Sequence, residues 1–557
     1  MSVTHYICKY TPVELLSAFG GQCAILNHMP ENFDRSDQVS HPNLCGFGKA
    51  LLETCLEGGV KELVLVNCCD TIRSAYDVLL EYGKLDFLFL LDVLHAGGEC
   101  SRACTRRELQ RLARAYGAYK GAEFDPAKFR AAFRPAERPK EPCLSVLGGR
   151  VGDELFAMME EAMPLPVRND TCVHNRSVPP PEGEMDFDAL MDWYAGALLG
   201  QLPCMRMTDI TGRRQLVNDP HLRGVIYHTV KFCDYYGFEY SELRRQLTVP
   251  LLKLESDYTI QSSGQLRTRL EAFAESIAPE RTIQKGGTRT VKGKGLYAGI
   301  DSGSTSTDVV ILNRDREIVA QAILPTGAGA AAGADRALDE ALDKAGLTRA
   351  DITATVTTGY GRGAIQLGDQ SITEITCHAK GAFFLDPSVR TIIDIGGQDS
   401  KVIRVDDTGN VVNFVMNDKC AAGTGRFLEL MARTLELSLE EMSTAGLDWK
   451  EEVTISSMCT VFAESEVVSL IAQNRTPADI IHGLNRSVAS KTVALCRRVG
   501  GEEAYMMTGG VSKNRGVAAE IEKLLGAPLH ISEKAQLNGA LGAALFALDS
   551  LDSTART

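Results

Sequence analysis

The sequence predicts an α/β protein of at least two domains, the second of which is internally duplicated. The chain has 557 residues, more than a single hydrophobic core usually serves. Short apolar runs alternate with stretches of helical periodicity through the first half. In the second half, a strand, a glycine-rich turn and a second strand follow one another over residues 296–312. The same pattern recurs over residues 390–405.

The composition is that of a globular protein without a membrane or nucleic-acid partner. Hydrophobic residues make up 44% of the chain and charged residues 24%, and the formal net charge is −13. A negative charge disfavours nucleic acid and anionic lipid, which attract basic proteins. Because neither an apolar run of about 18 residues nor a basic and then apolar leader occurs, we expect a cytoplasmic protein. Its sixteen cysteines are then expected to be free thiols or metal ligands.

Three apolar runs in the first half are predicted to be buried parallel strands. They cover residues 63–66, 87–91 and 144–147, and each precedes polar or glycine residues. Ligands of open α/β sheets bind where parallel strands end, so these ends are candidate site positions. Three prolines at residues 179–181 mark an irregular connection, near which we expect the domain to divide into two lobes.

A basic, glycine-rich segment separates the two halves of the chain. Residues 281–295 have almost no apolar periodicity, whereas residues 265–277 just before them have helical spacing. We therefore predict a first domain over residues 1–283, a linker over 284–294 and a second domain over 295–557.

The two repeated hairpins of the second domain predict a site for phosphates and a divalent cation. Each hairpin has an acid at the end of its first strand, Asp301 or Asp394, and glycines in the turn that follows. Such turns point backbone N–H groups at anions, and carboxylates on facing strands suit Mg²⁺ and an oriented water. The predicted catalytic residues are Asp301, Asp394 and Gln398. The predicted nucleotide-binding residues of the hairpins are Gly303, Ser304, Thr305, Gly396 and Gly397.

A third element near the end of the chain is a strand over residues 505–508, followed by a glycine pair that opens a helix. It suits the packing of a purine and ribose against backbone, and its predicted nucleotide-binding residues are Gly509, Gly510, Lys513 and Asn514. The three elements in this order resemble the superfamily of actin, sugar kinases and Hsp70 chaperones. The resemblance implies a duplicated fold with ATP or ADP and Mg²⁺ between its halves. Glycines that served only as hairpin turns would not require an acid at the end of each preceding strand.

Two cysteines of this domain, Cys420 and Cys459, are candidate ligands of an iron–sulfur cluster. A cubane normally takes four thiolates, so two copies of the chain would share one cluster across a twofold axis. Cys420 precedes a predicted helix start, where the helix dipole and free N–H groups favour a thiolate. The alternative is that both are buried structural cysteines, as we expect for Cys377 and Cys496.

The segments around these two cysteines, residues 417–429 and 457–466, resemble the activator ATPases of 2-hydroxyacyl-CoA dehydratases and benzoyl-CoA reductases. The resemblance extends over residues 296–547. It implies a homodimer with one interfacial [4Fe–4S] cluster held by Cys420 and Cys459, and an angle between the cluster-bearing helices that changes with ATP. A ferredoxin or flavodoxin would supply the electron.

The first domain resembles the catalytic D-type subunits of those dehydratases over residues 10–280. The matching stretches are residues 42–49, 67–73, 170–176, 202–205, 230–234 and 255–257. The resemblance implies an iron–sulfur cluster on three cysteines, which map best to Cys45, Cys69 and Cys233.

The further cysteines near these motifs are Cys68, Cys172 and Cys204. Six thiolates would hold a double-cubane [8Fe–9S] cluster, whereas a single [4Fe–4S] cluster would leave some of them as bystanders, and the adjacent Cys68 and Cys69 could include one such bystander. Reserve candidates for ligands or proton donors are Cys23, Cys100, Cys104, His95, His174 and His228.

Together these resemblances predict an ATP-hydrolysing iron–sulfur reductase suited to anaerobic conditions. ATP-dependent low-potential electron transfer would run from the second domain to the first-domain cluster, for the reduction of small molecules. The transfer needs energy, because moving one electron to an acceptor whose reduction potential is about 59 mV lower than that of the donor costs about 1.4 kcal/mol. An alternative is a dehydratase- or benzoyl-CoA reductase-type component that acts on an acyl-CoA with a single [4Fe–4S] cluster and a fused activator. A small-molecule kinase of the actin-like superfamily and an ATP-driven interaction switch like Hsp70 are further alternatives.

Overall fold

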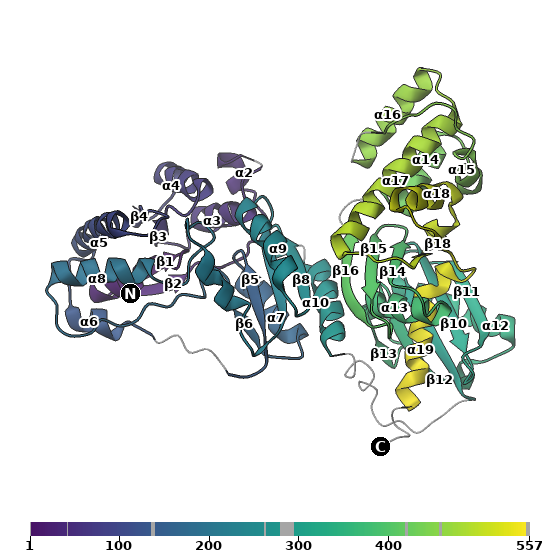
Figure 1. The fold of residues 1–557 in the computed structure, drawn as a ribbon, viewed down its shortest axis with the longest axis horizontal. Helices are drawn as coiled ribbons and strands as arrows, with labels where there is room; N and C mark the ends of the chain where they lie inside the picture. The colour runs from purple at the N-terminus through teal and green to yellow at the C-terminus, as the bar shows by residue number, and fades with distance from the viewer. Residues whose placement is uncertain are drawn as a thin grey trace. The chain divides into compact units, whose positions relative to one another are not determined.

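The computed structural model describes residues 2–41, 43–134, 140–260, 263–278, 294–417, 421–455 and 459–552. The chain forms two compact units, Met1–Leu270 and Glu271–Thr557. The colour runs from purple to teal along the first unit and from teal to yellow along the second (Figure 1). The predicted linker lies outside the described residues except for Lys294.

The first unit contains two four-stranded parallel sheets, with the strand orders β2-β1-β3-β4 and β6-β5-β7-β8. The strands of the first sheet are β1 (Val3–Tyr6), β2 (Gln22–Ile25), β3 (Glu62–Val66) and β4 (Phe87–Leu91). The strands of the second sheet are β5 (Cys143–Gly148), β6 (Val167–Asn169), β7 (Leu222–Val230) and β8 (Leu251–Ser256). The three parallel strands predicted from apolar runs are confirmed as β3, β4 and β5. Every residue of β3 and β5 is buried, as expected for strands covered on both faces.

Helices connect these parallel strands. Those of the first sheet's lobe are α1 (Val13–Ala18), α2 (Ser36–Val39), α3 (Gly46–Leu56), α4 (Asp70–Tyr82), α5 (Glu99–Lys120), α6 (Pro126–Ala131) and α8 (Phe187–Leu199). Those that follow the second sheet's strands are α7 (Asp153–Ala162), the 3₁₀-helix η1 (Thr211–Leu216), α9 (Asp234–Gln246) and α10 (Ser263–Ile277). Local signals start several of them. Asp125, for example, accepts hydrogen bonds from two N–H groups of α6, whose first residue is Pro126.

The two lobes do not divide near Pro180, as the proline run had indicated. The second sheet already begins with β5, and α8, which follows the prolines, belongs to the first lobe. This helix buries Leu190, Tyr194 and Leu198 in the same core as Leu112 of α5. An apolar helix face must be covered, so long-range packing of α8 sets the boundary and the prolines only mark a turn.

The second unit contains two five-stranded sheets with equivalent strand orders, β11-β10-β9-β12-β13 and β16-β15-β14-β17-β18. In each, the first three strands along the chain are antiparallel neighbours and the last two join in parallel. The strands of the first sheet are β9 (Leu296–Ser302), β10 (Ser306–Leu312), β11 (Ile318–Pro325), β12 (Ile352–Thr358) and β13 (Gln370–Ser371). The strands of the second are β14 (Thr391–Ile395), β15 (Ser400–Val405), β16 (Val411–Asn417), β17 (Tyr505–Thr508) and β18 (Leu529–His530). The predicted duplication is confirmed.

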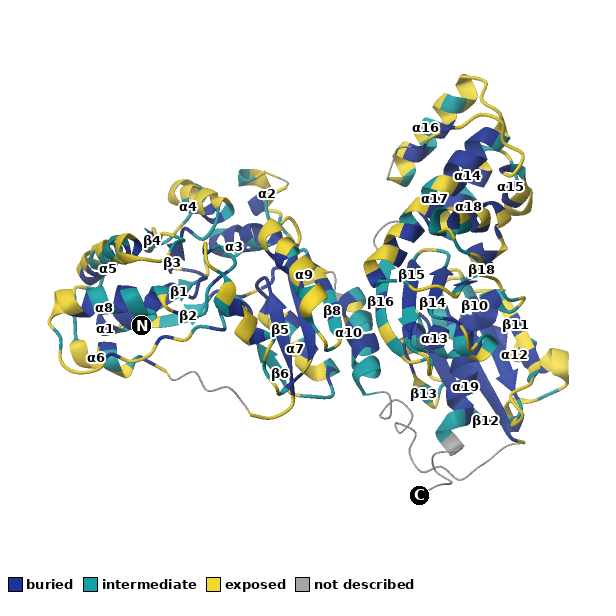
Figure 2. Ribbon diagram, viewed as in Figure 1, coloured by how far each residue is buried: buried dark blue, intermediate teal, exposed yellow. Residues whose placement is uncertain are grey.

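The helices of this unit are α12 (Ala330–Ala345), α13 (Glu374–Leu385), α14 (Gly425–Thr434), α15 (Leu439–Ala445), α16 (Thr460–Ala472), α17 (Pro477–Val499), α18 (Arg515–Leu525) and α19 (Asn538–Asp552), with short 3₁₀ turns that include η5 (Gly510–Lys513). Local sequence signals set both ends of helix α17. Thr476 is its N-cap, Pro477 is its first residue, and Gly500 has the left-handed conformation after its last turn. The sheets and α19 are mostly buried, whereas α16 is largely exposed (Figure 2). Within the described residues, no helix combines the length and apolar character needed to cross a lipid bilayer.

Candidate functional site

The two predicted catalytic aspartates end equivalent strands of the two sheets in the second unit. Asp301 lies in β9 and Asp394 in β14, and their side chains are only 13% and 3% exposed. Glycines make room for both. A Cβ atom on Gly539 or Gly359 would strike the carboxylate of Asp301, and one on Gly509 would lie 2.9 Å from an oxygen of Asp394. The backbone is therefore built around these two carboxylates.

A buried histidine of α13 brings the two aspartates together. His378 Nε2 lies 3.7 Å from Asp301 Oδ2, and its Nδ1 lies 3.4 Å from Asp394 Oδ1. The side-chain amide of Asn538, at the start of α19, donates to the backbone carbonyl of His378 at 3.0 Å. The acids of the two repeats therefore meet across one imidazole, a contact that sequence reasoning missed.

A buried lysine holds the acids of the second repeat. Lys401 Nζ lies 3.2 Å from Asp394, 3.0 Å from Asp399 and 3.3 Å from Glu374. Burial alone would lower the pKa of Lys401, but the three carboxylates outweigh it and raise that pKa well above its usual value. Burial likewise works to raise the pKa of Asp394, but His378 and Lys401 hold it below the usual value. Asp394 is therefore a carboxylate with a permanent counter-ion.

Among the described residues, no lysine forms an ion pair with the acids of the first repeat, although the charge of Lys401 acts on Asp301 and that of Lys513 on Asp308. Burial raises the pKa of Asp301, and burial followed by the nearby charge of Asp301 raises the pKa of Asp308 to about 8. Within the described part of the chain, buried side-chain oxygens of Ser302, Asp308 and Asn538 have no hydrogen-bond partner. Orphaned polar atoms beside a glycine-lined carboxylate fit a site that takes a charged ligand.

The structure brings the two predicted glycine turns into contact. The β9–β10 turn carries Gly303, Ser304 and Thr305, and the β14–β15 turn carries Gly396 to Gln398. A Cβ atom on Gly397 would clash with the side chain of Thr305, so the turns pack directly on one another. The side chain of Gln398 is exposed in its turn.

The third predicted element lies beside Asp394. Thr508, the last residue of β17, donates a hydrogen bond to Asp394 Oδ1 at 2.8 Å, and Gly509 follows with a φ of 83°. Gly510 opens η5, which ends at Lys513. Asn514 caps α18, because its side-chain oxygen accepts a hydrogen bond from Val517 N at 2.9 Å. That contact gives Asn514 a structural role in addition to its predicted one.

The second glycine turn also contacts the segment that follows Cys420. Gly425 N donates to Gly396 O at 2.9 Å and Arg426 N donates to Gly397 O at 2.8 Å, which ties the first turn of α14 to the turn. The hydroxyl of Ser400 donates to Gly423 O at 3.0 Å. Cys420 itself lies outside the described residues. The backbone immediately after it is nonetheless held by the predicted phosphate turn.

Cys459 stands exposed at the N-cap of α16. Val461 and Phe462, in the first turn of α16, are 64% and 67% exposed. The exposed face of α16 is visible in Figure 2. The first N–H groups of a helix have no partner within the helix, so this thiol lies beside free backbone donors.

The three best-matched cysteines of the first unit also lie at helix starts. Cys45, Cys69 and Cys233 are the N-cap residues of α3, α4 and α9. A hydrogen bond with the Cys233 thiol lowers the pKa of Cys45 to about 7. A hydrogen bond with the neighbouring thiol of Cys68 lowers the pKa of Cys69 to about 6. The structure therefore pairs Cys45 with Cys233 and Cys69 with Cys68, and in each pair the pKa of the first thiol is lowered while that of the second is raised.

One thiol of this group was missed. Cys8, which follows β1, is buried, and a hydrogen bond with Cys68 lowers its pKa. Because β1 and β3 are parallel neighbours, residues that follow them meet at the same edge of the sheet. The available signal was a cysteine after a four-residue strand, which is too short to predict by periodicity.

The remaining predicted ligands lie nearby, among buried cations. Burial raises the pKa of Cys172 to about 11, and the nearby Cys204 adds to that rise. Cys204 Sγ lies 3.8 Å from the hydroxyl of Tyr236. The guanidinium of Arg206 stacks 4.1 Å above the ring of Tyr235, and its charge acts on Cys69. Among the described residues, no group of three or more His, Cys, Asp or Glu is arranged around a single metal ion. Ligands of a polynuclear cluster stand farther apart, since the cluster's own atoms lie between them.

The reserve candidates lie in structural positions. His228 is buried and its Nε2 lies 2.8 Å from the hydroxyl of Ser256, and burial lowers its pKa to about 4. Burial also lowers the pKa of His174 to about 4 and that of His95. Cys100 and Cys104 lie on α5, and Cys104 Sγ accepts a hydrogen bond from Arg107. Cys23 lies in β2 and burial raises its pKa to about 12, while Cys377 and Cys496 are buried.

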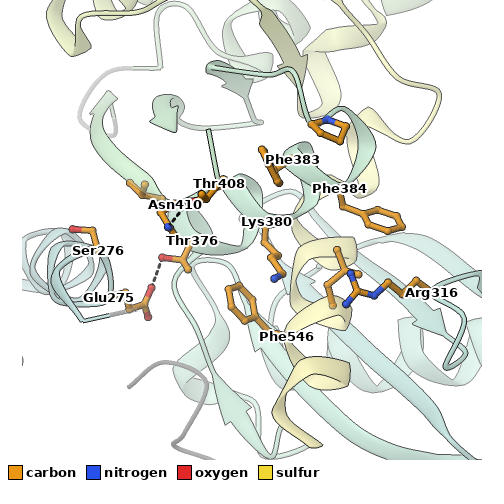
Figure 3. A pocket seen from close by; sticks show the side chains of 15 residues that line it. Glu275, Ser276, Arg316, Thr376, Lys380, Phe383, Phe384, Thr408, Asn410 and Phe546 are labelled. Carbon is orange, nitrogen blue, oxygen red and sulfur yellow. Dashed lines mark hydrogen bonds between the residues drawn. The ribbon is translucent and has the colours of Figure 1, made fainter. Parts of the chain in front are cut away.

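A cavity of about 360 Å³ lies beside α13 (Figure 3). Lys380 and Phe383 of that helix line it together with Phe546 of α19 and Arg316. No predicted site residue is among those that line it, so the cavity is separate from the aspartates and glycine turns.

Comparisons with known proteins match each half of the chain. The family model of the BadF/BadG/BcrA/BcrD ATPases matches residues 298–547, and that of the 2-hydroxyglutaryl-CoA dehydratase D-component matches residues 8–146 and 134–277. The activator of lactoyl-CoA dehydratase from Anaerotignum propionicum is 50% identical over 252 residues, which are 45% of this chain and 97% of the relative. The (R)-2-hydroxyglutaryl-CoA dehydratase activating ATPase of Acidaminococcus fermentans is 48% identical over 250 residues, or 45% and 95% of the two chains.

A solved structure matches the same half. The activator of the 2-hydroxyisocaproyl-CoA dehydratase from Clostridium difficile with bound ADPNP is 42% identical and covers 47% of this chain and 98% of its own, with a TM-score of 0.46. The duplicated sheets and paired aspartates define the second unit as an ATPase of the actin, Hsp70 and sugar-kinase fold. More specifically, the chain belongs to the BadF/BadG/BcrA/BcrD ATPase family, and its first half is a D-component domain of the 2-hydroxyglutaryl-CoA dehydratase type. The predicted fusion is confirmed.

Proposed function

We propose that the chain uses ATP in its second unit to drive electron transfer to an iron–sulfur centre in its first unit. The observation that carries this proposal is the backbone link from Gly396 and Gly397 to Gly425 and Arg426, at the start of α14. A turn that changes position when phosphate binds would displace the segment that follows Cys420. Nucleotide chemistry would thereby reach a candidate cluster ligand through hydrogen bonds alone.

The nucleotide would bind among the aspartates and glycine turns. Asp301 and Asp394 would hold Mg²⁺ and orient the attacking water, with Gln398 beside them. Backbone N–H groups of the turns at Gly303–Thr305 and Gly396–Gly397 would bind the phosphates, and Gly509–Asn514 would bind the purine and ribose. When bound, Mg²⁺ neutralises charge that develops on the phosphate oxygens.

The donor cluster would be a [4Fe–4S] centre shared by two copies of the chain. Cys420 and Cys459 of each copy would supply its four thiolates. The exposure of Cys459 supports this assignment, because a ligand shared with a second chain must lie at the surface. A ferredoxin or flavodoxin of the cytoplasm would reduce the cluster.

The acceptor would be an iron–sulfur cluster held by the cysteines that lie near the ends of the first-unit strands. Its six predicted ligands are Cys45, Cys68, Cys69, Cys172, Cys204 and Cys233, which suit a double-cubane [8Fe–9S] cluster and the reduction of small molecules. A second candidate function is supported by the D-component match and by relatives that activate dehydratases. In that function, a single [4Fe–4S] cluster on Cys45, Cys69 and Cys233 would serve the dehydration of a 2-hydroxyacyl-CoA.

Iron analysis of the full chain, purified without oxygen, tests the proposal and separates the two candidates. About ten irons per chain are expected for a double cubane plus half of a shared cubane, and about six for a single cubane plus the same half. A Cys420→Ser variant should lose about two irons per chain and its ATP-dependent electron transfer. Cys100→Ser, an exposed cysteine of α5, is the matched control and should keep both. Colourless, monomeric, iron-free protein would refute the proposal.

A further inference from the structure

One arginine among the cysteines of the first unit has no polar partner. Arg206 follows Cys204 by two residues, inside a turn that is closed by the hydrogen bond from Met207 N to Cys204 O at 3.0 Å. Its side chain is partly buried. Within the described part of the chain, its guanidinium forms neither a hydrogen bond nor an ion pair. A guanidinium carries five N–H donors, so a full set of donors and a positive charge remain available here.

The ring of Tyr235 holds this guanidinium in place. The central carbon of the Arg206 guanidinium lies 4.1 Å from the centre of the ring. Tyr235 is in the first turn of α9, two residues after Cys233, which is the N-cap of that helix. Stacking on an aromatic ring fixes the plane of a guanidinium without using its N–H groups. The stack therefore ties the turn after Cys204 to the start of the helix that follows Cys233.

Other buried cations near these cysteines use their donors within the protein. Lys9 Nζ donates a hydrogen bond to Asn175 Oδ1 at 2.9 Å, and Arg150 Nε donates one to Asn27 Oδ1 at 3.0 Å. These contacts give both side chains a role in holding loops of the first unit together. Arg206 differs from them, because among the described residues only the aromatic ring holds it.

The charge of Arg206 reaches two of the thiols that best match the D-type subunits. A hydrogen bond with Cys68 lowers the pKa of Cys69, and the charge of Arg206 lowers it further. A hydrogen bond with Cys45 raises the pKa of Cys233, and the charge of Arg206 opposes that rise. The guanidinium thus lies close enough to both thiols to favour negative charge on them.

We propose that Arg206 raises the reduction potential of the first-unit cluster, the iron–sulfur centre proposed above on Cys45, Cys69 and Cys233, and that Tyr235 positions the guanidinium for this role. The inference rests on the proposed function and names a residue that acts beside the thiolate ligands and is not one of them. One electron passed from the shared cluster adds a negative charge to the first-unit cluster. A nearby positive charge stabilises that reduced form.

Two consequences follow for the proposed electron transfer. A higher potential of the acceptor reduces the energy that the ATP-driven step must supply. Because Cys69 and Cys233 are ligands in both candidate functions, the effect is expected for a single cubane and for a double cubane alike.

Redox titration of the full chain, purified without oxygen and followed by electron paramagnetic resonance, tests the inference. The signal that persists in Cys420→Ser belongs to the first-unit cluster, because that variant lacks a ligand of the shared cluster. Arg206→Gln should shift the midpoint potential of this signal to lower values, whereas Arg206→Lys keeps the charge and should stay closer to the parent. The midpoint potential of the shared cluster should not change. Arg114→Gln removes an exposed arginine of α5 and is the matched control, which should titrate as the parent does.

Two variants of Tyr235 make the outcome decisive. Tyr235→Leu removes the stack but keeps the arginine, and it should lower the first-unit potential by less than Arg206→Gln does. Tyr235→Phe keeps an aromatic ring and should retain the parental value. An unchanged or higher first-unit potential in an Arg206→Gln protein that retains its iron would overturn the inference. If that variant loses its iron, equal potentials in Tyr235→Leu and Tyr235→Phe would overturn it instead. A parent without a first-unit signal would refute the proposed function, so the two failures are distinguishable.

Discussion

The two repeats of the ATPase unit bury an aspartate at the same place in the same hairpin but surround it differently. In the second repeat, Lys401 lies opposite Asp394 and also contacts Asp399 and Glu374, so the positive charge is part of the chain. In the first repeat, Asp308 lies opposite Asp301, and among the described residues neither acid forms an ion pair with a lysine or an arginine. The two repeats therefore share a backbone pattern but differ in electrostatics: Asp394 has a lysine as its counter-ion, whereas the charge of Asp301 acts against that of Asp308.

Removing the built-in cation should have the largest effect. Lys401→Met leaves three carboxylates buried without a counter-ion, and we expect the free energy of unfolding to fall by about 3–5 kcal/mol. Denaturant unfolding of the metal-free chain measures it. Lys344→Met, at an exposed lysine of α12 that pairs with Glu340, should change stability by less than about 0.5 kcal/mol. Equal effects of the two variants would mean that Lys401 does not hold the second repeat together.

Removing the charge of Asp301 should reduce ATP turnover more than it reduces stability. Asp301→Asn keeps the shape of the side chain but removes its charge, and we expect the rate of ATP hydrolysis to fall about a hundredfold or more. Steady-state hydrolysis with matched circular dichroism spectra measures it. A variant that hydrolyses ATP at the parental rate would show that the first repeat is not the catalytic one.

Pushing the two glycine turns apart should lower the affinity for ADP by an intermediate amount. In Gly397→Ala, the added methyl group meets the side chain of Thr305, so the two glycine turns must move apart at a cost of about 1–3 kcal/mol. Affinity for ADP, measured by calorimetry, should fall accordingly. Gly363→Ala has open space around its added methyl group and is the matched control. If the two variants bind ADP equally well, the contact between the turns is not needed for binding.

The smallest expected effect is on how stability depends on pH, through one buried carboxyl group of the second repeat. Burial raises the pKa of Glu374 to about 7, against 4.5 when exposed, although Lys401 opposes the rise. The folded chain therefore retains a proton that the unfolded chain has released between these values, so this group lowers the free energy of unfolding as the pH rises from 4.5 to 7. In Glu374→Gln that contribution is absent, so the stability of the variant relative to the parent should increase as the pH rises through the window. A difference that stays constant with pH would contradict the raised pKa.

Sequence reasoning succeeded where function and local structure coincide. Asp301 and Asp394 were selected because each is followed within a few residues by the glycines of its own turn, and the structure brings both to one histidine. The duplication of the fold followed from the same local pattern. Cys45, Cys69 and Cys233 were selected by their surrounding motifs, and the structure places them at the starts of α3, α4 and α9.

What sequence reasoning missed depends on partners that are distant in the chain. His378 acquires its place only when α13 packs between Asp301 and Asp394, and nothing around it in sequence indicates that contact. Lys401 stands near glycine-turn residues but gains significance only from strand register. Cys8 becomes a neighbour of Cys68 through the pairing of β1 with β3. The boundary between the lobes was misplaced for the same reason, because α8 packs on a helix far earlier in the chain.

The hydrogen bonds that Gly425 and Arg426 donate to the second glycine turn involve main-chain atoms only. Any amino acid with a backbone N–H can make them, so replacing the side chain of Arg426 with that of alanine leaves this connection intact. Proline is the exception, since it fits the first turn of a helix yet carries no amide hydrogen. A survey by alanine substitution would therefore leave both hydrogen bonds in place, whereas a proline at either position would remove one of the two and still fit the first turn of the helix.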